Sequence, residues 1–191
     1  MTSTRVSEPT RREQILAIAA DLFAARGFHG VSVADIGAAC GISGPALYKH
    51  FVSKDAVLAE MLVSISEQLL EVGRDRVAGA ETPATALRGL IDWHVDFALR
   101  HRALIVVQDR DWESLPAQAR EQVRALQREY VDLWAAQLHQ LHGSHRLDAA
   151  QAMAHAAFGL INSTPHSGKL PDASMHALLA DMAERALRLT E

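Results

Sequence analysis

The chain has 191 residues and a formal net charge of −4, and 49% of its residues are hydrophobic while 5% are aromatic. This length fits one mid-sized domain or a small domain joined to a larger one, and the Ala- and Leu-rich composition favours a helical bundle. The net charge argues against nucleic-acid binding by the chain as a whole. Residues 1–55, however, hold six Lys or Arg against five Asp or Glu, which permits such binding locally.

Cysteine content and hydropathy exclude two further classes of protein. Cys40 is the single cysteine, so no intrachain disulfide can form, and this fits a reducing compartment. We interpret Cys40 as a small buried residue, with a redox role as the alternative. Residues 1–13 lack the apolar core of a signal peptide, and no apolar run approaches the length needed to cross a bilayer. We therefore expect a cytoplasmic protein with no membrane partner.

The first predicted helix begins near Thr10 and ends before Gly27. Thr10 is suited to cap the helix with Glu13 as its capping-box partner, and Gly27 can adopt the left-handed conformation that follows a helix end. Apolar residues recur at spacings of three and four between residues 15 and 23, so one side of this helix is expected to face a core.

Residues 32–54, SVADIGAACGISGPALYKHFVSK, predict two short helices separated by a tight break. Ser32 caps the first of them and Gly41 supplies the turn. Ser43 caps the second, which is expected to run to about Phe51 with Pro45 in its first turn. An apolar helix, a turn of about three or four residues and a compact second helix are the parts of a DNA-binding helix-turn-helix.

The stretch from residue 11 to residue 58 resembles the N-terminal domain of the TetR family of bacterial transcriptional regulators. The resemblance rests on the helix end F-A-A-R-G-F, the segment S-V-x-D-I, the turn C-G-I-S and the run L-Y-K-H-F-x-S-K-D. It implies an all-helical homodimer whose variable C-terminal domain binds a small ligand and dimerises.

By this resemblance, nine residues form the DNA-binding surface. The residues expected to contact phosphates are Ser32, Ser43, Tyr48, His50 and Lys54, and those expected nearest the base edges are Gly44, Pro45, Ala46 and Lys49. Ordinary helix packing or capping is the alternative for Tyr48 and His50. Lys49 is the one strong donor expected to reach the bases, so specificity should also depend on thymine methyl groups and DNA shape.

The rest of the chain predicts six more helices, giving an all-α fold of about nine helices. Their approximate ranges are 55–77, 83–101, 103–109, 116–141, 147–163 and 172–189. The helix over 55–77 is long enough to join the DNA-binding unit to the C-terminal part of the chain, and no Gly-, Ser- or Pro-rich linker separates the two parts. We assign residues 1–55 to a helix-turn-helix DNA-binding domain and residues 56–191 to a ligand-binding and dimerisation domain.

Catalytic and metal-binding patterns are missing from the sequence. There is no P-loop, no dinucleotide glycine pattern, no Gly-x-Ser-x-Gly elbow and no His-Glu-x-x-His. We therefore predict neither an enzymatic activity nor a cofactor. His139, His142 and His145 are spaced by three, but Gly143 breaks the helix between the last two, so we interpret them as a solvated helix end rather than a metal site.

The C-terminal part mixes large aromatic side chains with isolated polar groups. A largely apolar cavity with a few polar groups is the usual ligand site between helices of a bundle. The candidate ligand-binding residues are Trp93, His94, Phe97, Gln108, Trp112, Trp134, His155, Phe158 and Asn162, and a plain core position is the alternative for each. Because charged groups are scarce at these positions, we expect an apolar or acyl-type ligand.

The last two predicted helices, within residues 148–189, are suited to dimerisation. The first is rich in small residues and permits close approach of another helix, and the second has an apolar face, so two such pairs would form a four-helix interface. We therefore predict a ligand-responsive transcriptional repressor that binds a palindromic operator as a homodimer and is released by its ligand. The alternative is a helical small-molecule-binding or scaffolding protein whose helix-turn-helix is only structural.

Overall fold

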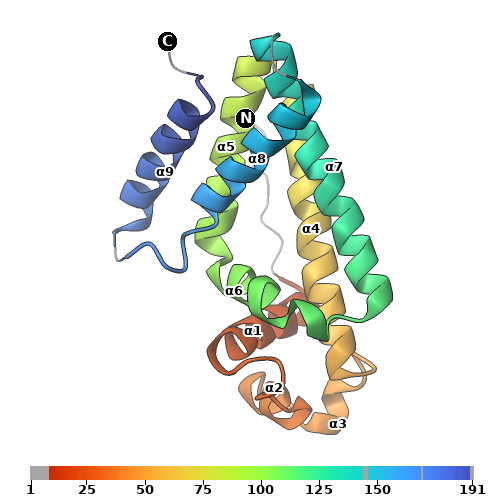
Figure 1. The fold of residues 1–191 in the computed structure, drawn as a ribbon. Coiled ribbons are helices and arrows are strands. Elements are labelled where there is room, and N and C mark those ends of the chain that lie inside the picture. Colours follow the sequence, from red (N-terminus) through yellow and green to blue (C-terminus); the bar gives the residue numbers. More distant parts are fainter. Residues whose placement is uncertain (1–8, 144–145, 169, 190–191) are drawn as a thin grey trace, which may run out of the picture.

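The computed structural model describes residues 9–143, 146–168 and 170–189 (Figure 1). The regular elements within them are α1 (Arg11–Arg26), α2 (Val33–Ala39), α3 (Gly44–Leu47), α4 (Lys54–Ala78), α5 (Pro83–Arg100), α6 (Arg102–Asp111), the 3-10 turn η1 (Trp112–Ser114), α7 (Ala117–His142), α8 (Leu147–Ile161) and α9 (Asp172–Ala186). These described ranges contain no strand, and the predicted all-α fold is confirmed.

Side-chain caps and one glycine define the N-terminal helices. The Thr10 hydroxyl accepts from the N–H of Glu13 and the Glu13 carboxylate accepts from the N–H of Thr10, which forms the predicted capping box. After α1 the chain turns at Gly27 with φ 77°, a conformation that glycine adopts without steric cost. Ser32 and Asp35 form a second capping box at the start of α2.

The second helix of the helix-turn-helix is shorter than expected. Its α-helical part is α3, and residues 48–50 continue as turns. In this segment the Lys49 N–H donates to the carbonyl of Ala46 and the His50 N–H donates to the carbonyl of Leu47. Such i to i+3 bonds are common at helix ends, where they tighten the last turn. The prediction of a helix as far as Phe51 is therefore wrong, although Phe51 is buried as expected.

Helix α4 is the long axis that joins the two ends of the molecule (Figure 1). Helices α5 and α7 pack along α4, while α8 packs on α7 and α9 packs on α5. Helix α6 leaves this bundle and packs against α1. The N-terminal helices are thus attached to the bundle both through α4 and through α6.

The last two helices stop two to three residues earlier than predicted. After α8, the Thr164 hydroxyl donates to the carbonyl of Ala98 in α5, and this bond holds the turn that leads away from α8. After α9, Arg188 adopts φ 56°, which interrupts the helical backbone.

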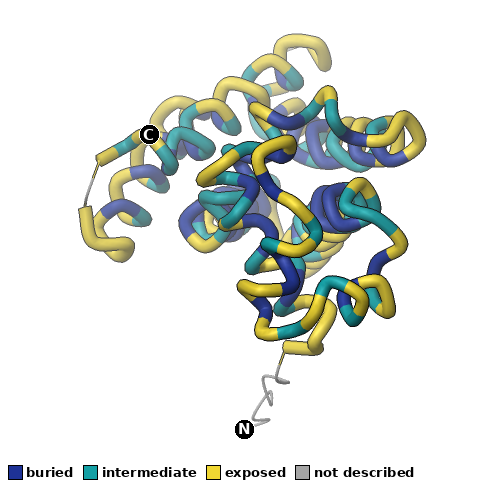
Figure 2. Tube along the Cα trace, turned by 90° about the horizontal axis from the view of Figure 1, so that it is seen from below, coloured by how far each residue is buried: buried dark blue, intermediate teal, exposed yellow. Residues whose placement is uncertain are grey.

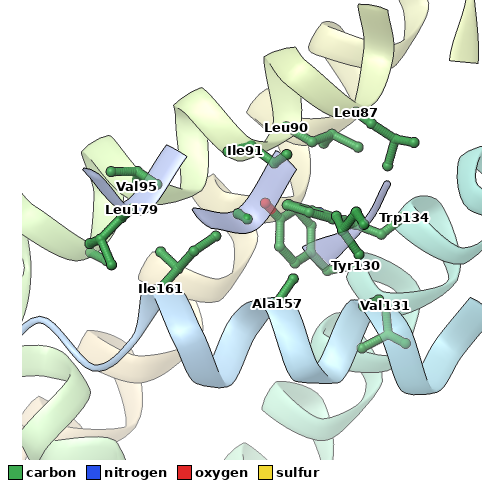
Figure 3. Packing of buried hydrophobic residues seen from close by; sticks show 14 of the residues in the cluster. Leu87, Leu90, Ile91, Val95, Tyr130, Val131, Trp134, Ala157, Ile161 and Leu179 are labelled. Carbon is green, nitrogen blue, oxygen red and sulfur yellow. The ribbon is translucent and has the colours of Figure 1, made fainter. Parts of the chain in front are cut away.

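Buried side chains form two hydrophobic clusters. The N-terminal cluster joins the inner faces of α1 to α4 with Val107, Leu115 and Val123 of the α6–α7 region. The C-terminal cluster lies among α5, α7, α8 and α9 and includes the fully buried Trp134 (Figure 3). From below, Figure 2 shows buried and exposed positions alternating along the helices. The DNA-binding unit therefore shares its core with α6 and α7 and does not pack as a separate head.

Candidate DNA-binding surface and ligand cavity

The exposed surface of α3 and the following turn carries the residues expected nearest to DNA. Tyr48 is 55% exposed, Lys49 and Pro45 are also exposed, and Gly44 and Ala46 are half-buried beside them. These five neighbours form one continuous stretch with a phenol, an ammonium group and small apolar surfaces. Such a stretch suits phosphate contact by Tyr48 and base-edge contact by Lys49.

The two cap serines are already hydrogen-bonded within the protein. The Ser32 hydroxyl donates to the Asp35 carboxylate at 2.6 Å and accepts from the Asp35 N–H at 3.1 Å. The Ser43 hydroxyl accepts from the N–H of Ala46 at 3.3 Å. The bonds at Ser32 also lower the pKa of Asp35, whose carboxylate accepts from the side chain and backbone of that serine. Both serines are exposed, so their predicted phosphate contacts would be made by groups that also fix the helix starts.

Lys54 points back into the protein. Its ammonium group donates to the carbonyls of Phe28 and Val31 at 2.8 and 2.9 Å and lies 4.2 Å from the centre of the Phe28 ring. Lys54 thereby ties the connector between α1 and α2 to the start of α4. A phosphate contact was predicted for Lys54, and this structural role was missed.

Two arginines of α1 fasten the helix-turn-helix from behind. Arg11 donates to the carbonyl of Cys40, which ends α2, and Cys40 itself is buried. Arg12 donates to the Glu60 carboxylate of α4 and to the carbonyl of His50, and its guanidinium lies 4.2 Å from the centre of the Phe51 ring. The half-buried His50 is thus held at its backbone by a residue 38 positions away.

A cavity of about 220 Å³ lies among α4, α5, α6, α7 and α8. Six of the nine candidate ligand-binding residues line it: His94, Phe97, Gln108, His155, Phe158 and Asn162. Tyr130 lines it as well and was not among the candidates. Neither Lys nor Arg is among its lining residues, which fits an apolar or acyl-type ligand.

The three tryptophans among the candidates do not line this cavity. Trp93 is buried, and its indole N–H donates to the carbonyl of Leu69 at 3.2 Å. Trp112 lies in η1 beside the N-terminal cluster, and Trp134 is fully buried in the C-terminal cluster. Their positions correspond to the core alternative.

Polar atoms at the inner end of the cavity are unusually short of partners. The His94 Nε2 lies 3.1 Å from the Asn162 Oδ1, while the His94 Nδ1, the Tyr130 hydroxyl and the Trp134 indole N–H are buried with no hydrogen-bond partner. Burial lowers the pKa of His94 to about 4, so its ring is neutral at pH 7. Burial also raises the pKa of Tyr130, and the neighbouring Trp134 opposes this only in part. The inner end is therefore aromatic and uncharged.

A larger, open groove of about 680 Å³ lies between α1, α4 and α6. Its lining includes Ala17 of α1, the Arg12 and Glu60 pair, and Arg100 at the end of α5. On the far side of α6, Arg110 donates to the carbonyls of Phe23 and Ala24 at the end of α1. Helix α6 thus touches the ligand cavity on one face and α1 on another.

The three histidines considered for metal binding are not brought together as a site. Within the described ranges, no group of three or more His, Cys, Asp or Glu side chains is arranged to hold a metal ion. The His142 Nε2 lies 2.9 Å from the carbonyl of Leu187, and His145 lies outside the described residues. Among the helices that are described, none is long and apolar enough to span a membrane.

Comparisons with known proteins agree with both halves of this architecture. Residues 15–61 match the model of bacterial regulatory proteins of the tetR family, and residues 80–187 match the model of the tetracyclin repressor-like C-terminal domain. The transcriptional repressor KstR2 of Mycobacterium tuberculosis H37Rv is 32% identical over 111 residues. That match covers 58% of this chain and only 56% of KstR2.

Solved structures match over nearly the whole chain. The TetR family regulator PfmR from Thermus thermophilus has a TM-score of 0.82 at 25% identity, covering 96% of this chain and 99% of PfmR. A TetR-family regulator from Bordetella parapertussis 12822 has a TM-score of 0.81 at 30% identity, covering 95% of this chain and 94% of that regulator. This chain therefore belongs to the TetR family of bacterial regulatory proteins.

Proposed function

We propose that this protein is a transcriptional repressor that binds a palindromic operator as a homodimer and is released by a small apolar or acyl-type ligand. The observation that carries the proposal is the exposed stretch formed by Pro45, Tyr48 and Lys49, since an exposed phenol and ammonium on a short helix have no packing role. We assign residues 1–55 to DNA binding and residues 56–191 to ligand binding and dimerisation. The relatives named above are regulators, and no catalytic role is proposed.

Dimerisation through α8 and α9 is supported by the surface that these helices leave uncovered. Helix α8 exposes Ala149, Ala152, Ala156 and Gly159, and α9 exposes Leu178 and Met182 at 45% and 42%. Small residues permit close helix approach, and the leucine and methionine would be buried by a second copy. The two recognition segments would then read half-sites about 34–36 Å apart.

Ligand control would act through the two attachments of the DNA-binding unit. Helices α4 and α6 both line the cavity, and α6 is bonded to the end of α1 by Arg110. A ligand that prefers one placement of α6 and α4 would shift the population between two separations of the recognition segments. The operator affinity would change only by the difference in ligand affinity between those two arrangements.

The test is a mobility-shift titration with duplexes that tile the DNA upstream of the protein's own coding sequence. Lys49→Ala should weaken binding to the retarded duplex about tenfold or more, because a base-edge contact is worth about 1–3 kcal/mol. Arg74→Ala is the matched control, since it removes the same charge from an exposed ion pair with Glu129 on the bundle. Equal affinities for Lys49→Ala and the wild type would contradict the proposal and favour a purely structural helix-turn-helix.

A further inference from the structure

The ligand cavity and the groove beside α1 are separated by a wall one side chain thick. Ile65 of α4 and Leu104 of α6 line both spaces. Neither residue is fully buried, which fits side chains that face open space on two sides. A modest change of their rotamers would join the cavity to the groove.

The volumes indicate that the inner cavity is only part of a ligand site. Small-molecule sites usually measure about 300–1,000 Å³, and the inner cavity, at about 220 Å³, is smaller. An engineered cavity of about 150 Å³ holds the six carbons of benzene, so the inner cavity has room for roughly nine carbons. The groove, at about 680 Å³, lies within the usual range. A longer ligand would therefore have to extend past Ile65 and Leu104.

The distribution of charge orients such a ligand. The inner cavity is lined by aromatic rings and has neither Lys nor Arg in its wall, so it suits a hydrocarbon end. The groove has an apolar floor that includes Leu16, Met61 and Ala103, and Arg12 and Arg100 stand at its edge. An anionic head would keep its hydration and meet guanidinium groups there.

We propose that the groove between α1, α4 and α6 holds the head of an amphiphilic ligand whose hydrocarbon chain passes Ile65 and Leu104 into the inner cavity. This inference rests on the proposed function and specifies its ligand as a medium- or long-chain carboxylate or a similar anionic amphiphile. The head then lies against the DNA-binding unit itself.

This placement gives the ligand a direct route to the recognition segment. Arg12 lines the groove and is bonded to both the Glu60 carboxylate and the carbonyl of His50, which follows α3. A ligand carboxylate competes with Glu60 for Arg12, because both are anions that accept from the same guanidinium. Occupation of the groove therefore loosens the bonds that hold the end of the recognition segment to α1 and α4.

A competing route leads from the cavity to a groove between α7 and α8. That groove shares Val131 and His155 with the cavity wall, but most of its lining is polar or charged, including Arg128, Asp132 and Asp148. An alkyl chain would cross such a surface at a cost, whereas the α1 groove offers an apolar floor. The α1 groove is therefore favoured.

The experiment measures dodecanoate and hexanoate binding to the full-length protein by isothermal titration calorimetry. Ala17→Trp fills the α1 groove at an exposed position of α1, and Ala25→Trp is the matched control on the same helix outside the groove. Arg128→Trp fills the competing groove at an exposed position of α7. Operator affinity is measured for every variant with and without dodecanoate.

Dodecanoate should bind the wild type at least tenfold more tightly than hexanoate, because each buried methylene is worth about fourfold in affinity. Ala17→Trp should weaken dodecanoate binding at least tenfold and abolish its effect on operator affinity, while Ala25→Trp and Arg128→Trp should stay within about twofold of the wild type. Dodecanoate binding that survives Ala17→Trp, or that is lost in Arg128→Trp instead, would overturn the inference while leaving the proposed repressor intact.

Failure of the proposed function has a different outcome. If the wild type binds neither carboxylate, the ligand class is wrong, and this inference falls with it. If the wild type binds dodecanoate with the predicted dependence on Ala17 but binds no upstream duplex, the groove stands as a ligand site and the proposed repressor is contradicted.

Discussion

In the N-terminal unit, polar side chains at the helix ends are hydrogen-bonded: Ser32 and Ser43 cap α2 and α3, and Lys54 donates to two carbonyls. In the C-terminal bundle, the His94 Nδ1, the Tyr130 hydroxyl and the Trp134 indole N–H are buried without partners. Satisfied polar groups fix one geometry, whereas buried unsatisfied groups reduce the stability of the arrangement that contains them. The comparison indicates a rigid DNA-binding surface attached to a bundle whose interior can rearrange around a ligand.

The largest expected effect comes from the buried imidazole of the bundle. Burial lowers the pKa of His94 from 6.5 to about 4, so the unfolded chain binds more protons than the folded protein between these pH values. Folding stability should therefore be full above about pH 6.5 and fall as the pH drops towards 4, by up to roughly 3 kcal/mol. Urea unfolding at several pH values measures this loss.

The control for that experiment is His155→Gln, which replaces an exposed histidine of α8. The loss of stability between pH 6.5 and pH 4 should persist in His155→Gln and become smaller in His94→Gln. Identical pH profiles for the two variants would show that the buried imidazole is not the group responsible.

The second effect separates two lysines of the N-terminal unit. Lys54→Ala should lower the free energy of unfolding by about 2 kcal/mol, because it leaves the carbonyls of Phe28 and Val31 without their charged donor. Lys49→Ala should change stability by no more than about 0.5 kcal/mol, since Lys49 is exposed. Chemical denaturation of both variants tests the contrast. Equal stabilities would mean that Lys54 is as free as Lys49 and available for phosphate contact.

A smaller effect is expected at the start of α3. Ser43→Ala removes the acceptor for the N–H of Ala46 and should cost about 1 kcal/mol, the usual value for an N-cap. Ser174→Ala in α9 is the control, because Ser174 is exposed and lies inside the helix rather than at its cap. A thermal shift no larger in Ser43→Ala than in Ser174→Ala would argue against a rigid, capped recognition segment.

The smallest effect is expected where the bundle leaves a hydroxyl unpaired. Tyr130→Phe removes a buried hydroxyl without a hydrogen-bond partner, so the unfolding free energy should stay within about 0.5 kcal/mol of the wild type or rise. Differential scanning calorimetry of the ligand-free protein measures this. A marked fall in Tm would reveal a bond to the Tyr130 hydroxyl and weaken the comparison between the two regions.

The predictability of the fold follows the range of the interactions. The caps at Thr10, Ser32 and Ser43 and the turn at Gly27 depend on residues three or four positions apart, so the sequence alone indicated them. The bonds of Lys54 to Phe28 and of Arg110 to Phe23 join residues 26 and 87 positions apart. No local pattern announces such pairs, and Lys54 was therefore expected on the DNA side.

The ligand site was predictable only in part for a related reason. Large aromatic residues on helices fill cores and line cavities alike, and composition does not distinguish the two. His94, Phe97 and Phe158 line the cavity, whereas Trp134 is fully buried in the core. The groove beside α1 depends on how two distant segments approach each other, and no helix pattern encodes it.

The central claim is that the exposed surface of α3 reads a specific operator. The most direct measurement is fluorescence anisotropy of the wild type with the retarded upstream duplex and with a shuffled duplex of the same composition, at two salt concentrations. We expect at least about a thousandfold preference for the upstream duplex, and affinities for both duplexes that fall as salt rises. Equal affinity for the two duplexes at every salt concentration would contradict the claim.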